Sequence, residues 1–213
     1  VSQKPIKFGE NICVGDIGRS HLNIYRQILI GAKHAKTKYV AMAEDDILYS
    51  WEHFHTPTRG LPPEDTFMYD MNRLSIFTWS DPPMFSYRHK RMVVNQLIAP
   101  RKLLIESLEE RFAKFPDESK IHLKVWGDPG RYEHSLGVTV RKTDSFMCTC
   151  PSIVFSHEYA YGYMYNQGKR KRLGDLRILE VPFWGRPEDM LKKFYDPSKT
   201  GSSPSATKGT GAL

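Results

Sequence analysis

The sequence predicts a mixed α/β fold in which helices flank a mostly parallel sheet. The first observation is a helical pattern over residues 20–35, followed after a brief turn by the apolar run 39–43. A helix, a short loop and a continuously apolar strand in succession are typical of parallel sheets covered by helices. The second observation is the composition, 40% hydrophobic and 26% charged, which is that of an ordinary globular protein.

The first helix is predicted from its start signal and from its period. Ser20 is a good N-cap residue. Apolar residues then recur at the helical spacing and define one buried face: Leu22, Tyr25, Ile28, Leu29, Ala32 and Ala35. This spacing predicts a helix that ends near Ala35.

The middle and the end of the chain alternate short strands with two more helices. The β-type runs are 66–71, 74–79, 84–88 and 92–99, and turn residues between the first three suggest hairpin-like pairing. A second helix is predicted from Pro100 to Phe115, because proline is favoured at a helix start. Strands are expected near 137–142 and 145–155, and a last helix over 187–194.

Length and composition indicate a single folded unit with a tail. The 213 residues suit one domain, which we assign to 1–195. Residues 196–213 have hardly any bulky apolar side chain and are expected to be a flexible tail. The chain opens in loop-like residues without a methionine, so we expect that an N-terminal piece, with its first strand, precedes it.

The charge of the chain indicates which kinds of partner it could bind, and its cysteine content indicates the redox state of its compartment. The chain has 31 Lys and Arg against 24 acids, a net charge of +7, which favours anionic partners unless the basic runs are simply solvated surface. Three cysteines cannot all pair, and we expect reduced thiols in a cytoplasmic protein. No apolar run is long enough for a membrane span.

The most informative motif is the acidic cluster Glu44-Asp45-Asp46, directly after the apolar run 39–43. Alternation along a strand would put Glu44 and Asp46 on one face and Asp45 on the other. Carboxylates at a strand end can hold Mn²⁺ or Mg²⁺ beside substrate phosphates. The alternative is an acidic strand end that caps a turn or pairs with nearby Lys and Arg.

The helix "NIYRQILIGAKHA", followed by "AKTKYVAMAEDDILYSWEHF", resembles family 2-like glycosyltransferases of the GT-A fold, and in particular uncharacterised bacterial and phage-associated members. The likeness covers roughly residues 10–160. In those enzymes a D-x-D-type motif holds the metal and the diphosphate of a nucleotide-sugar, and here Glu44-x-Asp46 stands in its place. The resemblance implies a metal-dependent hexosyltransferase with Mn²⁺ or Mg²⁺, a nucleotide-sugar donor, expected to be a UDP-sugar, and an unidentified acceptor.

Further residues complete the expected site. His157 follows an apolar strand and is expected to be the third metal ligand beside Asp46 and Glu44, because the resemblance implies a late histidine; a plain hydrogen bond is the alternative. Asp128 is the first candidate for the base that activates the acceptor hydroxyl and Glu133 the second. An Asp-Pro-Gly turn explains Asp128 equally.

The donor nucleotide is expected to be bound by a set of residues around the metal. Asp45 would lie behind the metal ligands or cap a following helix, Arg19 would meet phosphate at a helix start, and Trp51 would wall the sugar pocket. Lys169 and Arg170 would close over the diphosphate from a basic loop. Surface placement is the alternative for each of them.

Two other functions fit part of the sequence. A nucleotidyltransferase can use similar metal carboxylates, but it usually shows a Gly-rich loop with a basic residue near its N-terminus, and none is visible here. A basic nucleic-acid-binding protein would use the aromatic and basic residues around Lys169–Arg172. The acceptor could accordingly be a glycan, a small molecule or a nucleic acid, and the oligomeric state is not indicated.

Overall fold

A computed structural model describes residues 1–18, 20–55, 60–78, 80–87, 92–117, 128–157 and 176–196. Its elements follow one another in this order: α1 (His21–His34), β1 (Tyr39–Ala41), β2 (Ile47–Leu48), α2 (Trp51–Phe54), β3 (Thr66–Asp70), β4 (Arg73–Phe77), β5 (Phe85–Tyr87), the 3₁₀ turn η2 (Val94–Gln96), β6 (Leu97–Pro100), α3 (Arg101–Lys114), α4 (Glu133–Leu136), β7 (Lys142–Phe146), β8 (Ser152–Ser156), β9 (Leu176–Ile178) and α6 (Pro187–Phe194).

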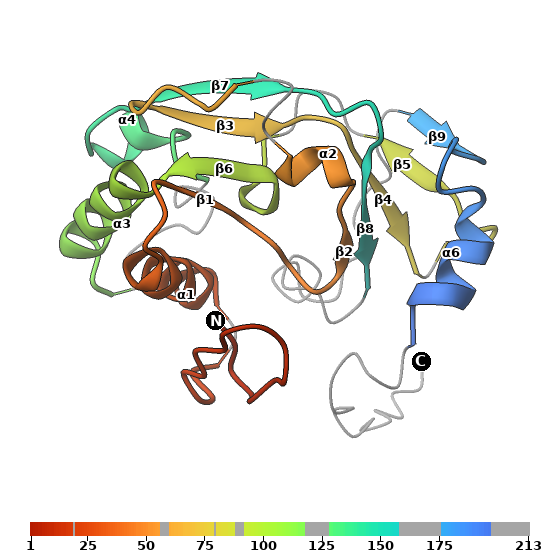
Figure 1. Cartoon of the computed structure of the whole chain (residues 1–213), viewed down its shortest axis with the longest axis horizontal. Coiled ribbons are helices and arrows are strands. Elements are labelled where there is room, and N and C mark those ends of the chain that lie inside the picture. Colours follow the sequence, from red (N-terminus) through yellow and green to blue (C-terminus); the bar gives the residue numbers. More distant parts are fainter. Residues whose placement is uncertain are drawn as a thin grey trace, which may run out of the picture.

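The strands form two mixed sheets, with the orders β1-β6-β3-β7 and β2-β8-β4-β5-β9 (Figure 1). The α/β class is confirmed. The expected mostly parallel sheet is wrong, because among the described strands only β3·β7 and β4·β8 are parallel pairs, whereas five pairs are antiparallel. The apolar run that suggested a parallel strand is short in the structure: β1 ends at Ala41 and pairs with β6 alone.

Three segments of the chain pass from the first sheet into the second (Figure 1). They lead from β1 to β2, from β3 to β4 and from β7 to β8. Because β3 and β4 lie in different sheets, the hairpin expected between them is wrong, whereas β4 and β5 do form an antiparallel pair. Hydrogen bonds fix the crossing of the last two segments: the Asn72 side chain donates to the Cys148 carbonyl at 2.7 Å, and Asp70 accepts from the Cys148 N–H at 3.2 Å.

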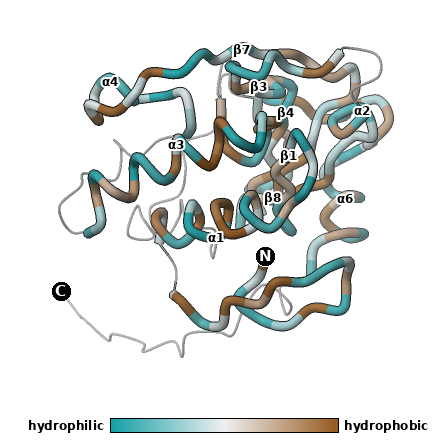
Figure 2. The backbone as a smooth tube through the Cα atoms, turned by 60° about the vertical axis from the view of Figure 1, so that its left-hand side comes forward, coloured by the Kyte–Doolittle hydropathy of each residue, from teal (hydrophilic) through white to brown (hydrophobic). Residues whose placement is uncertain are grey.

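The first core lies between the first sheet and two helices. The helix predicted from Ser20 is confirmed, since the Ser20 hydroxyl accepts from the Asn23 N–H at 3.1 Å and caps α1. Leu22 and Tyr25 of α1 are buried against Phe67 of β3 and Leu104 of α3. Along both α1 and α3, hydrophobic and hydrophilic residues alternate, as expected for helices that cover a sheet on one side (Figure 2).

The second core belongs to the second sheet. Ile76, Phe85 and Ile153 are buried in it, together with Met190 of α6. The helix predicted over 187–194 is confirmed, with Pro187 in its first turn. Among the described residues, none of the helices has the length and apolar character needed to cross a membrane. Beyond Asp196, the predicted tail lies outside the described residues.

Candidate functional site

The acidic cluster lies in the connection between β1 and β2, which runs from one sheet to the other (Figure 1). Residues 42–44 have no regular structure, and Asp45 and Asp46 form a turn. Glu44 and Asp46 are partly buried, whereas Asp45 is exposed. Asp45 therefore differs from the other two acids, as predicted, but the difference arises in a turn and not in a strand. Asp45 caps no helix, because the next one, α2, starts at Trp51 after Ser50.

Glu44 is held by two polar side chains. Its carboxylate Oε2 accepts from Asn95 Nδ2 at 3.2 Å. Its N–H donates to the Tyr49 hydroxyl at 3.1 Å, and that hydroxyl donates to the Asn95 carbonyl at 2.8 Å. Asn95 and Tyr49 therefore fix both the backbone and the side chain of Glu44. No motif or spacing in the sequence indicates Asn95, which lies in the short 3₁₀ turn η2.

Asp46 and His157 lie close together because they flank two neighbouring strands of the second sheet, β2 and β8. The antiparallel pairing of β2 with β8 brings them together, since Ile47 pairs with Val154 and the Phe155 N–H donates to the Asp46 carbonyl at 2.9 Å. The distance from His157 Nε2 to Asp46 Oδ2 is 3.9 Å. Both side chains are largely but not completely buried, with 13% of His157 and 25% of Asp46 exposed. Part of each side chain thus remains in contact with solvent.

Asp128 is bound to the same 3₁₀ turn as Glu44. Its Oδ1 accepts from the Val94 N–H at 2.6 Å, and Oδ2 forms an ion pair with Arg131 at 2.9 Å. Val94 and Asn95 are neighbours in the chain, so η2 places the carboxylates of Asp128 and Glu44 in one region. The Asp-Pro-Gly turn is also present, because the Arg131 N–H donates to the Asp128 carbonyl.

The electrostatics of Glu44 reflect this crowding of acids. Burial raises the pKa of Glu44, and the charges of Asp45 and Asp128 raise it further. The hydrogen bond from Asn95 and the charge of Arg73 act in the opposite direction and lower that pKa, but they do not cancel the rise. A cation bound beside Glu44 would favour its ionised form. Arg73, at the start of β4, is a neighbour that the sequence did not indicate.

Glu133, the second candidate base, has a different environment. Its side chain is 1% exposed and forms an ion pair with the buried Arg111, at 3.3 Å between Oε1 and the guanidinium. It also accepts from the N–H groups of Gly130 and Arg141, at 3.0 and 2.6 Å. These contacts hold α3, α4 and the following strand together. Glu133 is therefore a structural carboxylate and is poorly placed to reach an acceptor hydroxyl.

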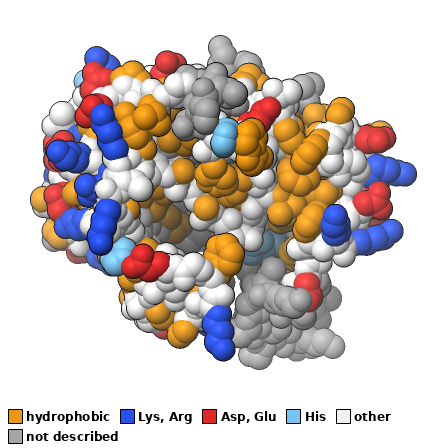
Figure 3. Space-filling model, viewed as in Figure 1, with side chains coloured by type: hydrophobic (Ala, Val, Ile, Leu, Met, Phe, Trp, Pro, Cys, Tyr) orange, Lys and Arg blue, Asp and Glu red, His pale blue; other side chains and the backbone are white. Residues whose placement is uncertain are grey.

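The residues expected to bind the donor are only partly described. Trp51 is 69% exposed at the start of α2 and stacks on His55, with 3.7 Å between ring centroids. Hydrophobic side chains gather near the centre of the face that carries α2, while Lys and Arg lie mostly toward its two sides (Figure 3). Arg19, Lys169 and Arg170 lie outside the described residues.

No family model, no curated protein and no solved structure matches this chain. The chemistry of the site is therefore what bears on function. The carboxylate of Asp46 and the imidazole of His157 are both metal-binding groups: carboxylate oxygen suits Mg²⁺ and Mn²⁺, whereas imidazole is more typical of the later transition metals.

Proposed function

We propose that this protein is a metal-dependent glycosyltransferase of the GT-A-like type, which moves a sugar from a nucleotide-sugar to an acceptor. The observation that carries the proposal is the proximity of His157 to Asp46. Glu44 lies two residues before Asp46 in the same connection, but among the described residues its carboxylate does not form one group of ligand atoms with theirs. Asp46 and His157 come from separate parts of the chain, and the sequence resemblance assigns both, together with Glu44, to the metal. A chance acidic turn would not require a histidine from the end of β8.

Asp46 and His157 could be two ligands of one divalent cation. Asp46 and His157 face one another at 3.9 Å, and both retain some exposure. Glu44 is oriented by Asn95 and Tyr49, as is usual for groups that support metal ligands. When bound, Mn²⁺ or Mg²⁺ would neutralise charge on the diphosphate that leaves the sugar. Two protein ligands, Asp46 and His157, would leave positions for phosphate oxygens and water.

We assign to Asp128 the role of the base that deprotonates the acceptor hydroxyl. Its side chain is 15% exposed, and its charge raises the pKa of Glu44, so that the two carboxylates share one region of the site. The Val94 N–H and the Arg131 guanidinium orient the carboxylate. In the proposed reaction this carboxylate would take up the proton of an acceptor hydroxyl as the hydroxyl oxygen attacks the sugar.

The proposal is tested by a thermal-shift panel of UDP-, GDP- and CMP-sugars with Mn²⁺ and without added metal. We expect at least one donor to raise the melting temperature only when Mn²⁺ is present, because a ligand that binds the native state stabilises it. Asp46→Asn should abolish this shift. Asp144→Asn is the matched control, since Asp144 is exposed on β7. The absence of any metal-dependent shift would contradict the proposal.

An oligonucleotide-binding assay beside that panel separates the transferase from a basic nucleic-acid-binding protein. Binding to nucleic acid through Lys and Arg weakens steeply with salt and needs no divalent cation. Retention of oligonucleotide binding in Asp46→Asn, together with no response to any nucleotide-sugar, would favour that other function.

A further inference from the structure

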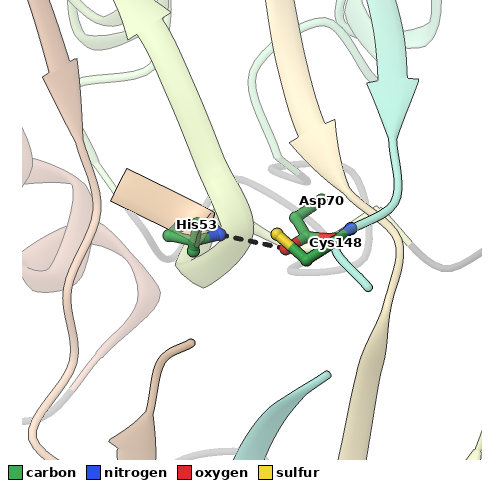
Figure 4. Close-up of side chains that lie close together, drawn as sticks. All are labelled: His53, Asp70 and Cys148. Atoms are coloured by element: carbon green, nitrogen blue, oxygen red, sulfur yellow. Dashed lines mark hydrogen bonds and ion pairs between the residues drawn. The ribbon is translucent and has the colours of Figure 1, made fainter. Parts of the chain in front are cut away.

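A second group of potential metal ligands lies where the chain crosses between the two sheets. His53 comes from α2, Asp70 is the last residue of β3, and Cys148 lies between β7 and β8. All three are buried, with exposed fractions of 1%, 0% and 2%. Their side chains point toward one another (Figure 4). None of them belongs to the Glu44–Asp46 site.

The distances are compatible with a small ion bound between the three side chains. One ligand atom from each residue lies within 4.8 Å of the others, and His53 Nδ1 is 3.1 Å from Asp70 Oδ2. In a tetrahedral zinc site, metal–ligand bonds of about 2.0–2.3 Å put neighbouring ligand atoms roughly 3–4 Å apart. The histidine and the aspartate already have that separation.

The surroundings orient the carboxylate for such a role. Asp70 Oδ1 accepts the N–H groups of Asn72 and Cys148, at 2.9 and 3.2 Å. These bonds hold the carboxylate so that Oδ2 faces the imidazole, which is the kind of outer support that metal ligands have in proteins. His53 Nε2 is buried and has no hydrogen-bond partner among the described residues, so the ring is oriented by its hydrogen bond at Nδ1 and by contacts with the rings of Tyr49, Phe54 and Phe146.

The donor types favour one class of ion. A thiolate and an imidazole are ligands for zinc and similar transition metals, whereas Mg²⁺ and Mn²⁺ prefer oxygen. A fully buried site also suits a structural ion, because binding free energy adds to the free energy of folding. The ion would join α2 to the β3–β4 and β7–β8 segments. Without it, the described contacts that hold these two segments together are hydrogen bonds, including those of Asp70 and Asn72.

We propose that His53, Asp70 and Cys148 form a structural zinc site, separate from the site proposed for the transfer reaction. The thiol proton of Cys148 is released on binding, and a small ligand such as water fills the fourth position. The inference does not rest on the glycosyltransferase proposal, because the residues, the ion and the role are different.

The first test measures metal content and Co²⁺ spectra of the whole chain. Purified protein is expected to contain stoichiometric zinc by plasma mass spectrometry. Exchange for Co²⁺ should give the near-ultraviolet charge-transfer band of a cobalt–thiolate bond and the visible bands of tetrahedral cobalt. Only trace zinc, with no thiolate band after Co²⁺ addition, would overturn the proposal and leave a trio held by hydrogen bonds alone.

Cysteine variants show which thiolate gives rise to the cobalt–thiolate band. Cys148→Ser should remove the thiolate band and weaken zinc affinity roughly tenfold or more. Cys13→Ser is the matched control, since Cys13 is exposed near the N-terminus, and it should leave both unchanged. Cys150→Ser should also retain the band, because Cys150 is not one of the three ligands. An unchanged band in Cys148→Ser would contradict the assignment even if that variant folds less well.

Discussion

The imidazole of His157 lies against the carboxylate of Asp46, with 3.9 Å between Nε2 and Oδ2. The contact depends on the antiparallel pairing of β2 with β8, in which Ile47 pairs with Val154. The pairing of β2 with β8 fixes the distance between the turn at Asp46 and the end of β8, which are far apart in sequence. This relationship underlies the metal site that we propose.

Replacing the histidine tests its role as a ligand. His157→Gln should weaken Mn²⁺ binding roughly tenfold or more, because the amide is a poorer donor than imidazole. The melting temperature without metal should change little, since the side chain is at the edge of the core. Titration of Mn²⁺ followed by electron paramagnetic resonance measures the affinity. An unchanged affinity would remove His157 from the site.

The buried ion pair between Arg111 and Glu133 should be a major support of the fold. Glu133→Ala leaves the guanidinium buried without its carboxylate and is expected to cost about 3–5 kcal/mol in urea unfolding at equilibrium. Arg111→Met should cost a similar amount. In a double-mutant cycle, the combined variant should lose much less than the sum of the two. Additive losses would mean that the two groups do not interact.

Glu110 should make stability depend on pH. Burial opposes its ionised form, but the hydrogen bonds from Thr139 and Arg141 prevail and lower the pKa of Glu110. A lowered pKa means that the stabilising effect is present at neutral pH, above the unfolded-state pKa, and is lost as the pH falls through the folded-state pKa. Glu110→Gln should therefore cost about 1 kcal/mol at pH ~7 and nearly nothing in strong acid.

The matched control for that experiment is the neighbouring residue. Glu109 forms an ion pair with Lys33 in which both side chains are about half exposed. Glu109→Gln should change the free energy of unfolding by well under ~1 kcal/mol at either pH. Equal effects of the two substitutions would show that general surface charge, and not the contacts of Glu110, sets the pH dependence.

Gly130 should tolerate no side chain. It has φ of +79°, and a Cβ there would overlap Cγ2 of Thr143 and lie 3.2 Å from Cδ2 of Phe67. Gly60 has nearly the same φ, +75°, and among the described residues nothing would lie within 4 Å of its Cβ. Gly60→Ala should cost about 1 kcal/mol for the left-handed conformation alone, and Gly130→Ala about 1–3 kcal/mol more for the overlap. Equal losses would mean that the turn after Asp128 can shift freely.

Local signals in the sequence predicted the longer helices α1, α3 and α6 but not the single-turn helices α2 and α4. The Ser20 cap and the apolar face that includes Leu22 and Tyr25 gave α1, and Pro187 gave the start of α6. The pairing of strands was predicted less well, because β3 and β4 look like a hairpin in sequence. They separate into two sheets since Asp70 and Asn72 bind the segment around Cys148, and such long-range bonds leave no periodic pattern.

The candidate site was predicted in part for similar reasons. Carboxylates in a run, as at Glu44 and Asp46, can be found by residue type and spacing. The contributions of Asn95 and Tyr49 depend on how η2 packs against the β1–β2 connection. Glu133 had the right residue type for a base, but its burial against Arg111 is a tertiary property that its neighbours in sequence do not indicate.

The most direct test of the transferase proposal is calorimetric titration of UDP and GDP into the protein, with Mn²⁺ and without divalent cations. We predict that at least one nucleotide binds only with Mn²⁺, that Asp46→Asn abolishes this binding and that Asp144→Asn preserves it. Failure of both nucleotides to bind with Mn²⁺, or binding that is equally strong without metal and in Asp46→Asn, would contradict the account.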